Sequence, residues 1–233
     1  MNGAPRINRV VVVGATGLVG AHLVELLSER DAVGQVVSVT RRPVDYESDK
    51  VQNEVIDFDN IQAHAELFKG DVLFSCLGTT LRQAGSIRAQ RIVDFDYQHQ
   101  IAKIAALNQV GHYLLVSSSG ANATSRSQYL KMKGELENAV SGLGFSHLSI
   151  VQPSLLLGDR SHKRIAEDLG AVVFPALCRL PGFKQYKPIH GRQVARKLIE
   201  LSVLRDSNVD QPAIEVLRLL EVFPNVEVFP DAD

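Results

Sequence analysis

The chain contains no tryptophan and only two cysteines among its 233 residues. Cys76 and Cys178 lie far apart in the sequence, which excludes a disulfide framework and a cysteine-based zinc site. None of the seven histidines belongs to an H-x-H or H-x-x-x-H pattern, so no metal site is expected. So few cysteines are typical of a reducing compartment, and we therefore expect a cytoplasmic protein.

The chain also lacks an excess of charge of either sign. Lys and Arg number 25 and Asp and Glu number 26, which gives a formal net charge of −1 and no general attraction for nucleic acid. Long apolar runs are absent as well, because the valines at 10–13 end in a glycine-rich turn and no stretch approaches the ~20 apolar residues that cross a bilayer. We expect no nucleic-acid partner and no membrane anchor.

What the chain does contain is the composition of a globular protein, with 45% hydrophobic and 22% charged residues. Short β-branched runs alternate with longer segments of helical period, the pattern of a parallel sheet with crossover helices. Strands are expected at 8–13, 35–40, 52–57, 71–76, 112–117 and 147–151, and helices at 17–29, 60–68, 89–109 and 128–141. The predicted fold class is therefore α/β, a doubly wound parallel sheet of the Rossmann type.

The alternation of strands and helices weakens beyond about residue 152, where LPGF and YKPIHG indicate loops. Residues 193–204 have the pattern of an amphipathic helix. We expect a single domain over residues 1–233, with a dinucleotide-binding core at about 1–151 and a small substrate-covering part at about 152–233.

A glycine-rich turn, GATGLVG at residues 14–20, follows the first strand and leads into a helix. Glycines at 14, 17 and 20 would let the backbone approach a pyrophosphate, which the free N–H groups of the helix would bind. The alternative is a tight strand-to-helix turn with no ligand. Because the turn follows the first strand of a βαβ series, the pattern favours a dinucleotide site at Gly14, Gly17 and Gly20.

The second strand ends in TRRP, which places Arg41 and Arg42 where the adenosine ribose of a bound dinucleotide would lie. Two guanidinium groups suit a 2′-phosphate, so the expected cofactor is NADP(H). The alternative is a solvated basic pair. At the end of the third strand, Asp57 could accept a hydrogen bond from the adenine amino group or cap the following helix, and the sequence leaves both readings open.

Further candidate site residues lie at and after the carboxyl ends of the fourth and fifth predicted strands. Leu77 and Gly78 in CLGT would pass beside the cofactor riboses, because ligands of open α/β sheets bind at this edge. Ser118, in SSSG after the fifth strand, lies at the same edge of the sheet. Tyr129 and Lys133 follow on a helix, four residues apart and so on one face.

These three side chains predict a proton-transfer site. A neighbouring ammonium favours the ionised form of a phenol, which suits it for acid/base catalysis. Tyr129 would exchange the proton, Lys133 would assist it and hold the nicotinamide ribose, and Ser118 would bind the substrate oxygen. The alternative is an exposed Tyr/Lys pair on an ordinary helix.

The motifs GATGLVG, the arginine pair, CLGTT, SSSGAN and YLKMKGELE, in this order, resemble the atypical short-chain dehydrogenase/reductase group. The similarity is greatest to the Tat-interacting-protein oxidoreductases and their bacterial relatives, and it covers roughly residues 8–200. It implies an extended-type Rossmann fold and NADPH as cofactor. The contacts it implies are Thr16, Gly17, Leu18, Val19, Arg41, Arg42, Leu77, Gly78, Tyr129 and Lys133, with Leu156 and Arg164 on a segment that returns over the nicotinamide.

Two positions depart from the pattern of extended relatives. Gln152 stands where many have arginine, and Asp94 stands where many have the asparagine of a proton relay. The expected function is an NADP(H)-dependent oxidoreductase acting on a carbonyl or alcohol of an unidentified small molecule. A non-catalytic NADPH-binding regulator that acts through a protein partner is the main alternative, and nucleotide-sugar epimerisation is disfavoured by the short C-terminal part. Homodimer formation is left open.

Overall fold

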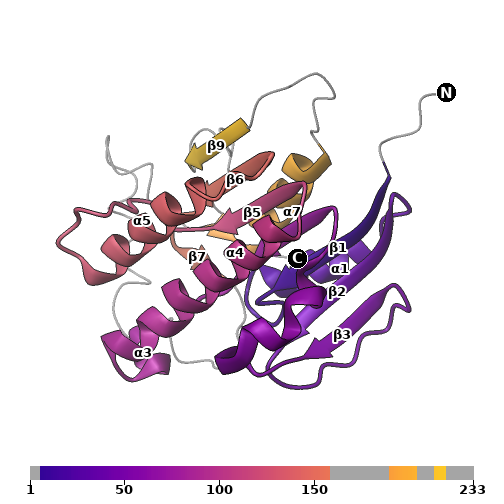
Figure 1. The fold of residues 1–233 in the computed structure, drawn as a ribbon, viewed down its shortest axis with the longest axis horizontal. Helices are drawn as coiled ribbons and strands as arrows, with labels where there is room; N and C mark the ends of the chain where they lie inside the picture. Colours follow the sequence, from indigo (N-terminus) through magenta and orange to yellow (C-terminus); the bar gives the residue numbers. More distant parts are fainter. Residues whose placement is uncertain (1–5, 158–188, 204–212, 219–233) are drawn as a thin grey trace, which may run out of the picture.

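The structure is a computed structural model that describes residues 6–157, 189–203 and 213–218. Within these residues the main sheet has seven strands in the order β3-β2-β1-β4-β5-β6-β9 (Figure 1). Its strands are β1 (Ile7–Val13), β2 (Val33–Thr40), β3 (Val51–Val55), β4 (Val72–Ser75), β5 (His112–Val116), β6 (His147–Gln152) and β9 (Ala213–Arg218). Every neighbouring pair is parallel. The predicted doubly wound α/β fold is confirmed.

The helical segments connect these strands. They are α1 (Gly20–Ser28), the 3-10 segment η1 (Phe58–Phe68), α2 (Leu81–Ala84), α3 (Ile87–Arg91), the π-helical turn η2 (Ile92–Tyr97), α4 (Gln98–Leu107), α5 (Gln128–Ser141) and α7 (Gly191–Val203). A separate pair of short parallel strands is formed by β7 (Leu156–Leu157) and β8 (Ile189–His190). The single helix expected at 89–109 is thus composed of α3, η2 and α4 in succession.

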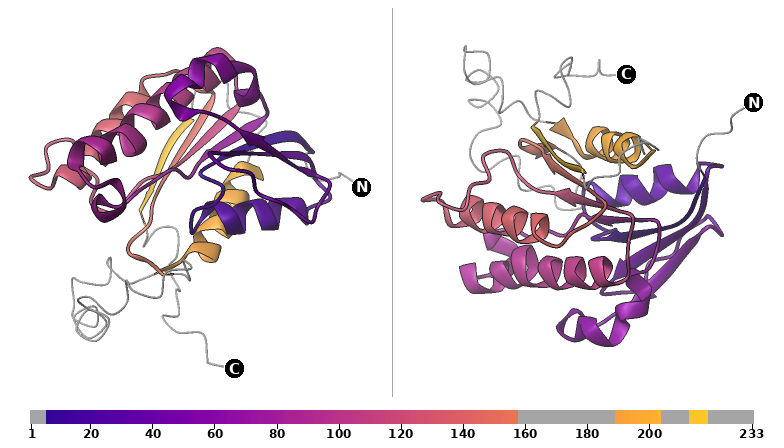
Figure 2. Two further views of the ribbon diagram at one scale, coloured as in Figure 1. Left: turned by 90° about the horizontal axis from the view of Figure 1, so that it is seen from below. Right: turned by 45° about the horizontal axis from the view of Figure 1, so that its top comes forward.

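The helices form two layers, with α4 and α5 on one face of the sheet and α1 and α7 on the other (Figure 2). The valines of β1 show why. Val10 and Val12 belong to the core beneath α1 and α7, whereas Val11 and Val13 belong to the core beneath α4 and α5. Because side chains alternate along a strand, a run of four valines suits a central strand that is buried on both faces.

Helix α7 joins the C-terminal part of the chain to the first βα unit. Arg192 forms an ion pair with Glu25 of α1 at 2.7 Å, and Gly191 packs closely on the glycine-rich turn. Strand β9, which the sequence did not predict, extends the sheet beside β6. Much of the expected substrate-covering part, 152–233, lies outside the described residues, so the division at about residue 151 stays a prediction.

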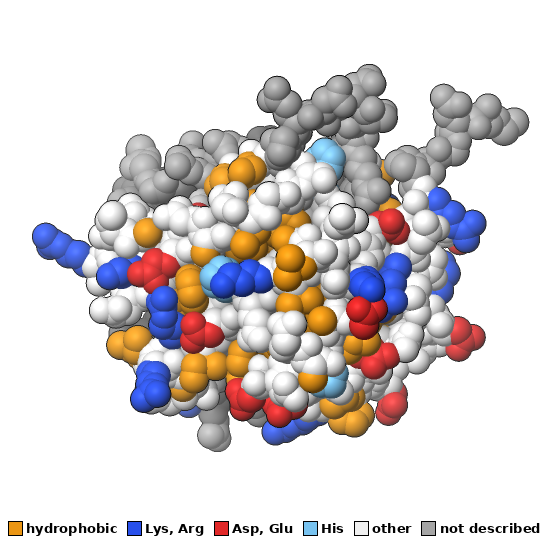
Figure 3. Space-filling model, in the orientation of Figure 1, with side chains coloured by type: hydrophobic (Ala, Val, Ile, Leu, Met, Phe, Trp, Pro, Cys, Tyr) orange, Lys and Arg blue, Asp and Glu red, His pale blue; other side chains and the backbone are white. Residues whose placement is uncertain are grey.

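The described surface carries mixed charge. On the face shown in Figure 3, basic and acidic side chains are interspersed among polar and apolar ones. This distribution agrees with the balanced composition. No helix among the described residues is long and apolar enough to cross a membrane.

Gly134 lets the loop after β5 lie directly on α5. A Cβ atom at this position would lie 2.3 Å from the backbone nitrogen of Ala123 and 2.4 Å from the carbonyl carbon of Asn122. The loop is tied to the same helix by a hydrogen bond from the Asn122 N–H to the Leu130 carbonyl at 3.0 Å. Any side chain at 134 would therefore displace the loop backbone.

We predict that Gly134→Ala lowers the free energy of unfolding by about 2 kcal/mol, because overpacking outweighs the helix propensity gained from alanine. Gly142→Ala, at the end of the same helix, is the matched control. A Cβ there would meet its nearest neighbour at an ordinary 3.7 Å, so the change should stay within about 0.5 kcal/mol. Urea unfolding of both variants measures the difference, and equal midpoints would contradict the packing argument.

Candidate functional site

The glycine-rich turn is pressed against the end of β4. Gly14 has a φ of 81°, and a Cβ there would lie 2.5 Å from the carbonyl carbon of Cys76. A Cβ on Gly20 would lie 2.2 Å from the carbonyl oxygen of Gly14. Both glycines are therefore required by the protein's own backbone. The steric requirement for glycine is weaker at position 17, where a Cβ would lie 3.2 Å from its nearest neighbour, the carbonyl oxygen of Gly14.

The turn delivers an uncapped helix N-terminus. Helix α1 has no side-chain hydrogen bond at its N-cap, Val19, and no acidic residue in its first turn. Free N–H groups with no competing carboxylate suit a pyrophosphate, so the turn fits the phosphates of a dinucleotide. Thr16 is exposed and Leu18 is half-buried. The side chain of Val19 is buried in the core, which leaves only its backbone to meet a ligand.

The expected adenosine end of the site lies beyond β2. Arg41 and Arg42 are both exposed on the loop that follows Thr40. Asp57 caps η1, since its carboxylate accepts a hydrogen bond from the Asp59 N–H at 3.0 Å. The helix-capping reading of Asp57 is thus observed, and its contact with adenine stays a prediction.

An aromatic residue and two carboxylates share this end of the sheet with the arginines. Tyr97 donates a hydrogen bond to Asp59. Burial raises the pKa of the Tyr97 hydroxyl to about 12, Asp59 and Asp57 act in the same direction, and Arg41 opposes them. This group was not singled out from the sequence.

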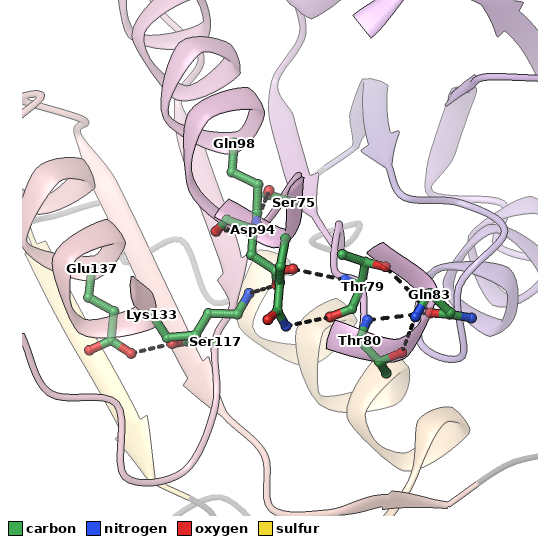
Figure 4. Close-up of polar contacts among 10 residues, drawn as sticks. Ser75, Thr79, Thr80, Gln83, Asp94, Gln98, Ser117, Lys133 and Glu137 are labelled. Carbon is green, nitrogen blue, oxygen red and sulfur yellow. Dashed lines mark hydrogen bonds and ion pairs between the residues drawn. The ribbon is translucent and has the colours of Figure 1, made fainter. Parts of the chain in front are cut away.

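Asp94 lies at the centre of the site, on the π-helical turn η2. Its side chain is 1% exposed, and one oxygen accepts a hydrogen bond from the Thr79 N–H at 3.0 Å. The other oxygen lies 3.2 Å from the ammonium of Lys133 (Figure 4). A Cβ on Gly78 would lie 3.6 Å from this second oxygen. The loop that follows β4 and helix α5 are therefore joined through one buried carboxylate.

The π-helical turn is stabilised by a buried amide. The Gln98 Nε2 group donates to the backbone carbonyl of Asp94 at 3.0 Å, and the Ser75 hydroxyl donates to Gln98 Oε1 at 3.0 Å. These bonds satisfy a carbonyl on the wider turn and connect it to β4. Sequence reasoning identified Asp94 only as a departure from relatives, because a π-helical turn has no recognised sequence signal.

Tyr129 and Lys133 differ in burial, although both project from α5. Lys133 is 2% exposed and Tyr129 is 36% exposed. Burial raises the pKa of the Cys76 thiol to about 12, and Lys133 acts against this shift, so the ammonium lies close to the end of β4. Tyr129 stands near the start of α5, which Ser127 caps. Within the described residues, neither the Tyr129 hydroxyl nor that of half-buried Ser118 forms a hydrogen bond.

The neighbouring serine has a structural partner. The Ser117 hydroxyl donates to Glu137 of α5, and the Gln152 side chain donates to both oxygens of Glu137 at 2.9 and 3.1 Å. Gln152, the second departure from relatives, thus ties β6 to α5 behind the site (Figure 4 shows Ser117 and Glu137). This network could not be predicted from the sequence, since its three members come from separate parts of the chain.

The returning segment is described only in part. Leu156 lies in β7, half-buried against the core beneath α1 and α7. Arg164 and Cys178 lie outside the described residues. No group of three or more metal-ligating side chains occurs in the part of the chain that the structure describes.

Two relatives cover most of this chain. Protein FMP52, mitochondrial, of Candida glabrata is 34% identical over 228 residues, which are 92% of this chain and 97% of the relative. Protein HTATIP2 of Rattus norvegicus is 37% identical over 172 residues, which are 72% of this chain and 71% of the relative. The resemblance to the Tat-interacting-protein branch is confirmed.

The prediction of a cytoplasmic location is wrong by this comparison. Several fungal relatives at 31–35% identity are named mitochondrial proteins. The prediction depended on the small number of cysteines, which indicates a reducing environment. Cysteine number does not distinguish one reducing compartment from another.

Solved structures and a family comparison agree on the fold. A UDP-N-acetylglucosamine 4-epimerase from Methanobrevibacter ruminantium superimposes with a TM-score of 0.65 at 16% identity, over 92% of this chain and 77% of that one. MoeE5 in complex with UDP-glucuronic acid and NAD gives 0.65 at 17% identity, over 90% and 75%. A family model described as NAD(P)H-binding matches residues 14–173. The chain therefore belongs to the NAD(P)H-binding family of atypical short-chain dehydrogenase/reductases.

Proposed function

We propose that this protein is an NADP(H)-dependent oxidoreductase that acts on a carbonyl or alcohol group of a small molecule. One observation carries the proposal: the glycine-rich turn is in contact with the end of β4, and Gly78, Asp94 and Lys133 continue from there to α5. A dinucleotide on the turn would extend along this edge toward the tyrosine and the serine. The glycine-rich turn and the residues proposed for proton transfer would thus share one edge of the sheet.

The cofactor would be held by backbone at its centre and by side chains at its ends. The backbone of residues 16–20 would bind the pyrophosphate, Leu77 and Gly78 would lie beside the riboses, and Arg41 and Arg42 would bind the 2′-phosphate. The nicotinamide would supply or accept the hydride. Leu156 and Arg164 are proposed contacts on the nicotinamide side.

Side chains of the protein would transfer the proton to and from the substrate oxygen. During reduction Tyr129 would donate its hydroxyl proton to the carbonyl oxygen, which becomes an alcohol, and during oxidation it would take that proton back. Ser118 would donate a hydrogen bond to the same oxygen and fix its position. Lys133, whose ammonium lies 3.2 Å from Asp94, would bind the nicotinamide ribose. The hydroxyls of Tyr129 and Ser118, which form no hydrogen bond to another described residue, suit these roles.

The Asp94–Lys133 ion pair also favours a second candidate. An ammonium whose charge is balanced by a buried carboxylate exerts a weaker field on a neighbouring phenol than a free ammonium does. A protein with this pair could bind NADPH and act through a protein partner without turnover. Tyr129→Phe would then leave both NADPH binding and partner binding unchanged, which separates the two candidates.

We predict that NADPH raises the melting temperature more than NADH does at equal concentration, because only NADPH carries the phosphate that the arginines would bind. The double variant Arg41→Ala/Arg42→Ala should lose this difference and keep the shift produced by NADH. Thermal unfolding with each cofactor measures both effects. A wild-type protein that responds equally to the two cofactors would contradict the NADP(H) assignment.

We predict that Tyr129→Phe lowers kcat on an accepted carbonyl substrate by about 100-fold or more, because general acid catalysis contributes roughly that factor. The Kd for NADPH should change little, since the aromatic ring remains and only the hydroxyl is lost. NADPH oxidation over a panel of aldehydes and ketones, with fluorescence titration of the cofactor, measures the two quantities. Equal turnover in wild type and variant would remove the mechanism.

We predict that Lys133→Met lowers the free energy of unfolding by about 3 kcal/mol, because it leaves the Asp94 carboxylate buried without a counter-ion. Adding Asp94→Asn should restore part of the loss, since the amide oxygen can still accept from the Thr79 N–H and carries no charge. Urea unfolding of the single and double variants tests the pair. Additive losses would show that the two side chains do not interact.

A further inference from the structure

The loop between β2 and β3 carries the two arginines proposed to recognise the cofactor's 2′-phosphate. Both side chains are exposed, and no hydrogen bond of either guanidinium to another described residue is present. An exposed arginine loses rotational freedom when it binds, and a mobile backbone would add to that loss. Selective binding by these residues therefore depends on how firmly their backbone is held.

Asn53 of β3 fixes this loop on both sides of the arginines. Its Nδ2 group donates to the Thr40 hydroxyl at 2.9 Å and to the Ser38 carbonyl at 2.9 Å, just before the pair. Its Oδ1 accepts from the Val44 N–H at 2.9 Å, just after the pair. One amide thus uses both donors and its acceptor to close a short span of chain.

A further bond carries the restraint to the arginines themselves. The Thr40 hydroxyl, which accepts from Asn53, donates to the backbone carbonyl of Arg42 at 2.7 Å. The other limb of the loop is held by Tyr46, whose hydroxyl lies 2.6 Å from the Ser38 hydroxyl. The backbone of the arginine pair is thereby linked to the sheet through side chains on both β2 and β3.

The β-strand propensity of asparagine does not explain its presence at position 53. Asparagine is depleted in β-strands, and β3 is one of the two edge strands of the described sheet, where a β-branched residue would have the higher strand propensity. Asn53 is only half-buried, so the core does not require it. Asn53 has low strand propensity, yet its side chain forms three hydrogen bonds that hold one loop. This combination indicates that the residue serves the loop and not the strand.

We propose that Asn53 is a specificity-determining positioning residue, which holds the Arg41–Arg42 backbone in the conformation that receives the 2′-phosphate of NADP(H). The inference rests on the proposed cofactor. Asn53 touches no cofactor atom in this scheme and acts through the arginines. Its contribution therefore concerns NADPH and leaves NADH binding unchanged.

The test compares cofactor affinities of Asn53→Ala with those of wild type and of Gln52→Ala. Gln52 is the adjacent β3 residue. Its exposed side-chain amide accepts a hydrogen bond from Gln35 at 2.7 Å and donates one to Glu54, and neither bond involves the arginine loop. Titration of NADPH and NADH by their own fluorescence gives both Kd values, and the chain has no tryptophan to absorb or transfer energy. Asn53→Ala should raise the Kd for NADPH about tenfold and change that for NADH less than about twofold. Gln52→Ala should change neither.

A double-mutant cycle separates positioning from general loss of structure. In an Arg41→Ala/Arg42→Ala background, Asn53→Ala should cause no further loss of NADPH affinity, because no guanidinium remains to be positioned. An equal loss for both cofactors, or a loss that persists without the arginines, would overturn the role of Asn53. Wild-type protein that binds NADH as tightly as NADPH would overturn the NADP(H) proposal itself, before any Asn53 variant is measured.

Discussion

The close approach of two backbones, at the ends of β1 and β4, is the constraint on which the rest of the site depends. Gly14 can face the carbonyl group of Cys76 only because it has no side chain, and its positive φ turns the chain into α1 at that point. The same approach fixes where Leu77 and Gly78 emerge. Asp94 contacts the loop that carries Gly78, and Lys133 pairs with Asp94. The contact between the two main chains therefore helps to set the distance between the glycine-rich turn and α5.

The fold was predictable because its signals are local. Four valines from 10 to 13 required a strand buried on both faces, and the glycines that follow required a tight turn into a helix. Strand β9 was missed because Ile214 and Val216 are exposed at the edge of the sheet, where burial imposes little pattern. The helix expected at 89–109 was predicted as continuous because the period of its apolar residues does not show the π-helical turn.

The residues of the candidate site at the ends of the strands could be predicted from the sequence. The contacts between side chains of different elements could not. The spacing of Tyr129 and Lys133 placed them on one face of a helix, but the start of α5 at Gln128 leaves the tyrosine at the rim and the lysine in the interior. The partners of buried polar groups come from distant parts of the chain. No pattern within α5 indicates that Lys133 pairs with Asp94, or that Glu137 receives hydrogen bonds from Ser117 and Gln152.

The glycine at the start of α7 has a consequence for the order in which the chain acquires its structure. A Cβ on Gly191 would lie 2.3 Å from the carbonyl oxygen of Leu18, so this residue rests on the glycine-rich turn more than 170 positions earlier in the sequence. During synthesis the N-terminal βα unit leaves the ribosome long before this contact can form, and contacts of such large sequence separation slow folding. The glycine-rich turn therefore reaches its final packing only after residue 191 has been translated.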